Sequence, residues 1–301
     1  MGGAQNRGGR VTDQSEPQAM SAPQGRQATP LSPTPGFCVM QALLTAHPWL
    51  VVASLVATPT LTGCCWDTEG SGVIVTETHI ISDHARVDVC CGWNVRIEQG
   101  DEPTVLVTGD DNIVEEIVVE QDGPVLRVRY ADPGESFRPT RPVEVTIRMA
   151  APEFVRASRG ASVRVEQLLG GVGGVDFSAG TTGCVDDVSL DRFEVTASDG
   201  SRVCAEVSDA GEVVVDSSVG SQVNLDGSTE RLRATVSIGG RLEAFGLQSE
   251  LAAVDVSDGS HAHVRVERSV TGAASGGSVV VVDGAAQIGV STSEGSRVER
   301  R

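Results

Sequence analysis

Residues 193–205 read FEVTASDGSRVCA, and residues 213–225 read VVVDSSVGSQVNL. Both stretches carry a Ser-x-Gly triplet between alternating apolar and polar residues. The triplet recurs through the second half of the chain at spacings of 20, 20, 20, 19, 20, 18 and 18 residues. Its serines and glycines are Ser158, Gly160, Ser178, Gly180, Ser198, Gly200, Ser218, Gly220, Ser237, Gly239, Ser257 and Gly259, followed by the triplets at Ser275 and Ser293. A repeat this regular predicts a solenoid of equal coils.

The residues around each triplet keep the same phase. Apolar sets such as Phe193, Val195 and Ala197 precede the turn, and sets such as Val203 and Ala205 follow it. The intervening positions are mostly polar, as expected for strands with one face inside and one outside. One coil cannot bury its own inner face, whereas stacked coils share a continuous core. The sequence therefore predicts an all-β fold, a parallel β-helix with coils of about 20 residues.

Residue types support this fold. Glycine in the triplet supplies the positive φ that a sharp corner needs, and serine can bond to nearby backbone. Aromatic residues are only 3% of the chain, which has 35 Gly. A core of small β-branched residues suits a narrow all-β stack. An antiparallel sandwich of hairpins is the alternative, although it leaves less reason for a fixed repeat length.

The chain is strongly acidic. Its formal net charge is -18, and every Lys or Arg position is an arginine. Such a surface repels phosphate backbones, so nucleic acid and anionic lipid surfaces are poor candidate partners. Solubility, association with cations and binding of neutral polymers remain open.

Residues 77–150 also have strand patterns but lack the triplet. They are expected to form irregular first coils and a cap, because an open helix end exposes unpaired backbone. Regular coils are expected over residues 151–301, so the β-helix domain is residues 77–301. The strands expected before the regular coils are Arg86–Val89, Asn94–Glu98, Val105–Val107, Ile113–Glu120, Val125–Arg129 and Val143–Ile147.

Residues 1–63 are expected to be a disordered leader followed by a lipoprotein-type signal peptide. The apolar run at residues 48–57 is too short to span a bilayer and matches a signal-peptide core. It leads to Leu61-Thr62-Gly63-Cys64, which resembles a bacterial lipobox and would make Cys64 the lipidated N-terminus. Residues 64–76 would then be a flexible tether.

Two other interpretations of that segment stay open. One is an accidental cysteine pair after an ordinary signal core, and the other is a buried apolar strand. The nearest upstream positive charge is Arg26, so an export signal starting at Met40 would lack the usual basic region.

The order of irregular strands and triplet coils resembles the head GIN domain family of auto-transporter adhesins, over roughly residues 80–298. The triplets are similar to that family's Ser-Gly turns. The residues that carry the resemblance in the first half are Val87–Val89, Asn94–Asp101, Val105–Ile113, Asp122-Gly123 and Val125–Val128. The resemblance implies a right-handed β-helix in a secreted or lipid-anchored envelope protein, and it supplies no catalytic residues.

Cys184 and Cys204 both lie six residues after a triplet serine, at an outward phase. They should stack on adjacent coils, within the Cα separation that a disulfide tolerates and in an oxidising compartment. We predict a disulfide between them, with two free thiols as the alternative. Cys90 and Cys91 would face opposite ways in a strand, so a bond between them is not expected.

No metal or other cofactor is predicted. His261 and His263 share the outer face, but a metal site needs a third ligand, so both are expected to be solvated. Residues 170–176 resemble a calcium-binding nonapeptide turn that occurs once, whereas such sites need stacked copies.

A polysaccharide-cleaving enzyme is the rival functional class, because many such enzymes are β-helices. The outward acids lie at several different phases, so no pair of catalytic carboxylates can be chosen. The chain also lacks a nucleophile elbow, a nucleotide loop and a His-Glu-x-x-His helix. We therefore predict an envelope or cell-surface lipoprotein of the outer membrane without catalysis. It would be an adhesin or binding module for a surface polymer or protein, or a structural scaffold, and would meet the membrane only through its lipid.

Overall fold

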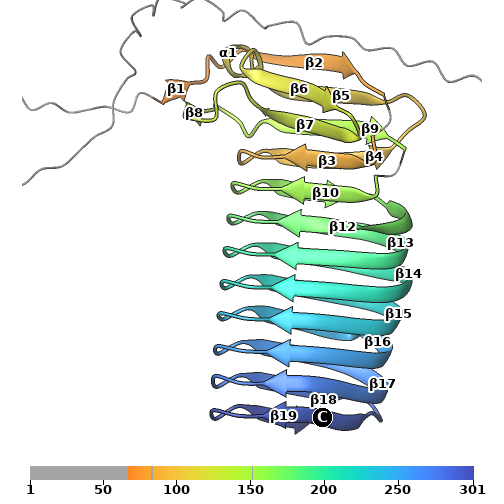
Figure 1. Ribbon diagram of the computed structural model, residues 1–301. Coiled ribbons are helices and arrows are strands. Elements are labelled where there is room, and N and C mark those ends of the chain that lie inside the picture. The colour runs from red at the N-terminus through yellow and green to blue at the C-terminus, as the bar shows by residue number, and fades with distance from the viewer. Residues whose placement is uncertain (1–66, 83, 151) are drawn as a thin grey trace, which may run out of the picture. The chain divides into compact units, whose positions relative to one another are not determined.

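The computed structural model describes residues 67–82, 84–150 and 152–301. The chain divides into two units, Met1–Leu61 and Thr62–Arg301, and all described residues belong to the second. This unit is nearly all β, with 67% strand. It forms a right-handed parallel β-solenoid with coils of ~20 residues (Figure 1), which confirms the predicted fold class. The predicted lipobox at Cys64 lies outside the described residues.

Two sets of strands follow one another along the chain. The first set is β1 (Thr68–Glu69), β2 (Ile74–Ile80), β3 (Arg86–Val89), β4 (Asn94–Gln99), β5 (Thr104–Asp110), β6 (Ile117–Asp122), β7 (Val125–Tyr130), β8 (Phe137–Arg138) and β9 (Glu144–Met149), with the short helix α1 (Asp111–Val114) between β5 and β6. The second set is β10 (Phe154–Ala157), β11 (Ser162–Val165), β12 (Leu168–Phe177), β13 (Thr182–Ala197), β14 (Arg202–Ser217), β15 (Gln222–Val236), β16 (Arg241–Val256), β17 (His261–Ala274), β18 (Val279–Asp283), β19 (Gln287–Thr292) and β20 (Arg297–Arg300).

Each regular coil has two straight sides. We call the side before a triplet the approach side and the side after it the return side. The triplet makes a tight corner between them, and at the other end the chain bends more widely within one long strand such as β13. The tight corners line up along one edge of the solenoid and the wide bends along the other (Figure 1).

Neighbouring coils lie parallel and in register. On the approach side Phe193 pairs with Val213, which pairs with Leu232. On the return side Cys184 pairs with Cys204. The recurring segments of the sequence therefore lie on top of one another, about 4.8 Å apart.

The tight corner needs positive φ at two residues. At one corner φ is 53° at Asp199 and 75° at Gly200, as in a type I′ turn. The amide of Ser201 donates to the carbonyl of Ser198 at 3.1 Å and closes the turn. The Gly200 amide donates to the Val219 carbonyl of the next coil at 3.0 Å, so the corners form their own hydrogen-bond ladder. From the sequence, positive φ was expected at the glycine alone, whereas the preceding residue adopts it too.

Two corners place a β-branched residue in this left-handed conformation. Val219 and Ile238 both have φ of 51°, and they are 43% and 58% exposed. Because a β-branched residue is strained there and asparagine tolerates it, Ile238→Asn should raise the free energy of unfolding by about 1 kcal/mol. Denaturant titration measures this change. Val172→Asn is the matched control, an exposed valine without positive φ. Equal changes in the free energy of unfolding for both variants would contradict backbone strain at Ile238.

The core is a thin layer of small side chains. Val195, Val215, Ala234 and Val254 are register partners and form one buried column. A second buried column follows the triplet glycines and consists mostly of hydroxyl residues. Its buried hydroxyl members are Thr181, Ser201, Ser221, Ser260 and Ser278. The hydroxyl of Ser201 donates to the Ser198 carbonyl at 2.6 Å, so this column reinforces the corners.

A cap closes one end of the stack with antiparallel pairs. On the return side β9 is parallel to β4 and antiparallel to β5, which is antiparallel to β2. On the approach side β7 is parallel to β3 and antiparallel to β6. The chain then passes to the opposite side of β3, where β10 pairs in parallel. The coil of β3 and β4 therefore lies between two later coils.

Two expectations about the first part are wrong. A flexible tether through residue 76 is excluded for the described residues, because β1 pairs with β8, β2 pairs with β5, and the Gly72 amide donates to Asp110 at 2.8 Å. Residues 113–120 are not one strand, because α1 covers the first two of them. Ile113 and Val114 are both buried, and the alternation of a strand cannot bury two neighbours on one face. Within the described part, no helix is long and apolar enough to cross a membrane.

Candidate binding site at the interrupted corner

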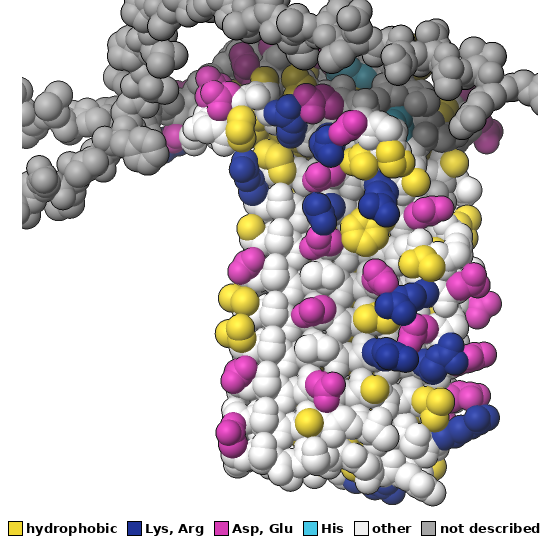
Figure 2. Space-filling model, viewed as in Figure 1, with side chains coloured by type: hydrophobic (Ala, Val, Ile, Leu, Met, Phe, Trp, Pro, Cys, Tyr) yellow, Lys and Arg dark blue, Asp and Glu magenta, His cyan; other side chains and the backbone are white. Residues whose placement is uncertain are grey.

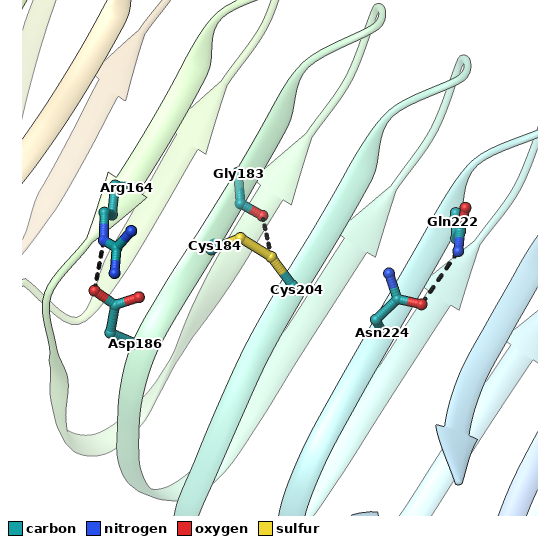
Figure 3. The surroundings of a disulfide bond; sticks show 7 residues. All are labelled: Arg164, Gly183, Cys184, Asp186, Cys204, Gln222 and Asn224. Carbon is teal, nitrogen blue, oxygen red and sulfur yellow. Dashed lines mark hydrogen bonds and ion pairs between the residues drawn. A yellow bond between two sulfur atoms is a disulfide. The ribbon is translucent and has the colours of Figure 1, made fainter. Parts of the chain in front are cut away.

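A disulfide joins the two outward cysteines of neighbouring coils. Cys184 of β13 and Cys204 of β14 are bonded, with their Cα atoms 4.5 Å apart. The bond lies on the return side between the Arg164–Asp186 ion pair and the hydrogen bond from Gln222 to Asn224 (Figure 3). It closes a loop with a sequence separation of 20, for which chain entropy gives about 3 kcal/mol of stabilisation.

A second disulfide joins the adjacent Cys90 and Cys91, which corrects the expectation of no bond there. The expectation placed both residues in a strand, but β3 ends at Val89. Residues 90–92 instead form a tight corner, with φ of 79° at Cys91 and 73° at Gly92. The Cys91 amide donates to the Ser158 carbonyl of the next corner at 3.3 Å. Cys-Cys-Gly therefore takes the place of Ser-x-Gly in this coil.

The next corner towards the cap has no triplet. Residues 131–143 connect β7 to β9 instead, and Phe137 of this connection packs with Tyr130 and Trp93 in an aromatic cluster. The indole Nε1–H of buried Trp93 donates to the Tyr130 hydroxyl at 3.0 Å. The Tyr130 ring stacks on Phe137 with centroids 4.3 Å apart. Burial raises the pKa of Tyr130, so its hydroxyl is protonated at neutral pH.

Two adjoining hollows open where the corner column is interrupted. Their volumes are about 180 Å³ and about 400 Å³. We call them together the corner cleft. Its lining includes Cys90, Cys91, Tyr130, Pro133, Phe137 and Arg159, of which Cys91, Tyr130, Pro133 and Arg159 face both hollows.

Charged side chains beside the cleft are mostly paired. Arginine and carboxylate side chains stand close together on the approach side near the cap (Figure 2). Arg127 lies 4.0 Å from Asp88, and Arg156 donates to Asp176 at 2.9 Å. Partial burial raises the pKa of Asp88, against the opposing effect of Arg156 and Arg127. Arg159 and Glu135 differ, because neither the exposed guanidinium of Arg159 nor the exposed carboxylate of Glu135, which lines the larger hollow, has an ion pair or side-chain hydrogen bond to any described residue.

Asp110 holds the segment over the cleft in place. The amide and hydroxyl of Thr140 donate to its carboxylate at 2.8 and 2.7 Å, and the Gly72 amide donates at 2.8 Å. The carboxylate is buried, yet the Thr140 hydroxyl and these amides lower the pKa of Asp110 below its ordinary value of 3.8. One side chain therefore fixes both the entry segment before β2 and the connection from β7 to β9.

This arrangement predicts acid sensitivity. Because the folded pKa of Asp110 is depressed, its contribution is present above the ordinary value of 3.8 and is lost as the pH falls through the folded pKa. Asp110→Asn should be less stable at neutral pH. The NH2 group of the asparagine cannot accept the hydrogen bonds that the carboxylate accepts from Gly72 and Thr140. The measurement is the free energy of unfolding between about pH 5 and pH 2. Equal pH slopes for the wild type and Asp110→Asn would contradict this role.

The return side carries two further hollows, about 450 Å³ and about 460 Å³ in volume. Arg96 and Arg164 line both of them. Each is already ion-paired, Arg96 with Glu98 at 3.6 Å and Arg164 with Asp186 at 2.7 Å. Neither arginine is therefore as free as Arg159 to pair with a ligand.

The predicted solvation is wrong for one of the two histidines. His261 is exposed, but the side chain of His263 is only 17% exposed. It lies 3.5 Å from Glu243 and contacts Asp283 on the coils on either side. No group of three or more His, Cys, Asp or Glu suited to a metal ion occurs among residues 67–82, 84–150 and 152–301.

The glycine-rich run at residues 170–176 belongs to β12. A Cβ at Gly173 would lie 2.0 Å from the Glu153 carbonyl oxygen, and one at Gly174 would lie 2.0 Å from that of Glu194. Glycine is therefore needed at these positions because the backbone of the neighbouring coils lies too close for a side chain. This packing explains the glycine-rich run without a calcium site.

Sequence reasoning missed the Cys90–Cys91 bond, Asp110 and the cleft. A signal was available at the cysteines. Gly92 follows them, and alternating apolar residues precede and follow the corner, as at the triplets. The predicted triplet residues lie at the stacked corners, and Cys184 and Cys204 lie together on the return side.

Comparison with known proteins gives a family and a fold. The model of the family described as "Putative auto-transporter adhesin, head GIN domain" matches residues 69–286. A "putative adhesin" from Parabacteroides merdae has a TM-score of 0.68 and 16% identity, covering 78% of this chain and 99% of its own. A "Putative lipid binding protein" from Parabacteroides distasonis has a TM-score of 0.66 and 17% identity, covering 78% of this chain and 100% of its own. At these identities the likeness shows the fold alone.

No curated protein matches the chain. The names of the family and of these structures are those of adhesins or a lipid-binding protein and not of enzymes, and an adhesin-like family suggests the cell surface or envelope. The structure contains the cap strands first and the triplet coils after them. This is the order that suggested the family in the sequence. The match over residues 69–286 covers most of the chain, which therefore belongs to the head GIN domain family.

Proposed function

We propose that this protein is a lipid-anchored binding module of the bacterial envelope that works without catalysis. Its ligand would be a surface polymer or protein, and its binding site would be the corner cleft. The observation that carries the proposal is the cleft itself, where an irregular connection replaces a regular corner beside a disulfide and an unpaired arginine. The adhesin-like family supports a binding role.

The proposed anchor is Cys64 in the lipobox-like sequence Leu61–Cys64. Thr68 of β1 follows four residues later and pairs with Phe137 of β8. Four residues span at most about 14 Å. The lipid would therefore hold the cap and the corner cleft close to the membrane, and the regular coils would extend beyond them.

Lipid attachment is tested by growing cells with radiolabelled palmitate. The native protein should incorporate label, and Cys64→Ala should not. Cys184→Ala is a control that removes a cysteine elsewhere and should keep the label. An unlabelled native protein would remove the lipid anchor from the proposal.

Binding is tested with the full chain on arrays of glycans and matrix proteins. A binding module should retain a ligand there, and a variant altered in the corner cleft should lose it. Arrays that stay empty, together with crosslinks in cells only to other envelope proteins, would favour a structural scaffold instead. Release of sugar fragments from a retained polysaccharide would contradict the absence of catalysis.

A further inference from the structure

The Cys90–Cys91 bond is expected to contribute little to the free energy of unfolding of the whole protein. A disulfide stabilises mainly by closing a loop in the unfolded chain, and the gain grows with loop length. The bond between Cys184 and Cys204 closes a loop with a sequence separation of 20, whereas the separation is 1 for Cys90 and Cys91. Neighbouring corners keep the same shape without cysteine, as Ser158-Arg159-Gly160 does directly below. The effect of this bond is therefore local, and it lies in the lining of the corner cleft.

Part of the wall of the cleft is apolar, between charged residues such as Arg159 and Glu135. The two half-buried cysteines, Pro133 and the rings of Tyr130 and Phe137 contribute to this part. The 400 Å³ hollow is within the size range of small-molecule sites, about 300–1,000 Å³. Flat apolar surfaces such as the two aromatic rings can pack against the C–H face of a sugar ring, which is apolar although its rim carries hydroxyls.

The cleft also offers directed polar groups. The Tyr130 hydroxyl accepts a hydrogen bond from Trp93, and its own proton has no acceptor among the described residues. Arg159 places a guanidinium without a partner at both hollows. An arginine can donate two parallel hydrogen bonds to one carboxylate. The Glu135 carboxylate in the larger hollow and the net charge of -18 both disfavour a ligand with many negative charges, so a ligand with one carboxylate, placed at Arg159, fits better.

From these features we propose that the corner cleft binds a sugar residue bearing one carboxylate, such as a hexuronate, within an otherwise uncharged glycan. The ring packs against Tyr130 and the Cys90–Cys91 bond, and the carboxylate pairs with Arg159. This inference rests on the proposed binding function and assigns the chemical class of its ligand.

The test compares two probes that differ only in the carboxylate, methyl β-glucuronide and methyl β-glucoside. Saturation-transfer NMR and titration calorimetry with the full chain should show binding of the glucuronide and binding of the glucoside that is weaker by about tenfold. Arg159→Ala should bring the glucuronide to the level of the glucoside. This variant keeps the fold, because it recreates the Ser-Ala-Gly corner found at Ser178–Gly180.

Matched controls separate the site from general effects. Arg202→Ala removes another exposed arginine that has no side-chain partner among the described residues, and it should leave binding unchanged. Cys90→Ser with Cys91→Ala should weaken glucuronide binding with little change in the denaturation midpoint. Cys184→Ser with Cys204→Ser should do the reverse, lowering the midpoint and leaving binding intact.

Three results would overturn the inference: no binding of either probe, equal binding of both, or unchanged glucuronide binding in Arg159→Ala. Its failure is distinguishable from failure of the proposed function. A chain that retains another ligand on the arrays through the corner cleft, yet ignores the glucuronide, is still a binding module whose ligand is not an acidic sugar.

Discussion

Replacing Phe177 with alanine is expected to lower the free energy of unfolding by about 3–5 kcal/mol, measured by denaturant titration. The core otherwise consists mostly of small side chains, and Phe177 is one of its largest fully buried residues. Across the interior the ring meets Gly183, where a Cβ would lie 2.5 Å from a ring carbon. The thin interior therefore accepts one large residue because the facing position has no side chain.

This pairing predicts coupled mutations. Gly183→Val alone should destabilise the protein by about 1–3 kcal/mol, because the added side chain collides with the ring. In the Phe177→Ala background the same valine should cost about 1 kcal/mol less, because the collision with the ring is gone and only the Val163 carbonyl oxygen, 2.8 Å from the Cβ position, remains. If the two changes were additive, Phe177 and Gly183 would not share the same space. Val203→Ala, at the corresponding buried position of the next coil, is the control for an ordinary loss of volume.

Deleting a whole coil is expected to preserve the fold, whereas deleting half a coil should unfold the regular part. Removal of residues 238–257 joins Ser237 to Asp258-Gly259 and restores a triplet corner. The approach strand that ends at Val236 can then pair with residues 269–274, which normally pair one coil further on. The shortened protein should keep a cooperative transition, with a solenoid about 4.8 Å shorter.

Removal of residues 238–247 is the contrasting deletion. It takes away a corner and a return strand but leaves the matching approach strand. The later segments therefore lose their hydrogen-bonding partners and the alignment of their core-facing residues. Far-UV circular dichroism and thermal unfolding distinguish the two products. Two deletions with equal stability would contradict a stack built from equal coils.

The regular coils could be predicted because local and global signals agree in them. Alternation at Val203 and Ala205 gives the inward face, and the triplet at Ser198 gives the corner and the spacing. The cap has no such repeat. Its antiparallel strands and α1 depend on contacts made only after folding, such as the hydrogen bonds from Gly72 and Thr140 to Asp110.

The candidate site could not be predicted from the sequence for a related reason. In space Cys91 lies beside Arg159, but the cap separates them in the sequence and breaks the spacing of the corners. The Cys90–Cys91 bond also depends on a corner that strand alternation alone does not indicate. By contrast, Cys184 and Cys204 lie within the regular repeat, so their proximity followed from counting residues.

The central claim, that successive coils stack in parallel and in register, is tested most directly by engineered cysteine pairs. Asn224 and Glu243 are register partners on the return side, whereas Arg241 lies two residues away on the same face. The account predicts that Asn224→Cys with Glu243→Cys forms a disulfide under mild oxidation, detected by mass spectrometry of the digested protein, and that Asn224→Cys with Arg241→Cys does not. A bond in the second pair and none in the first would show that the coils do not stack in this register.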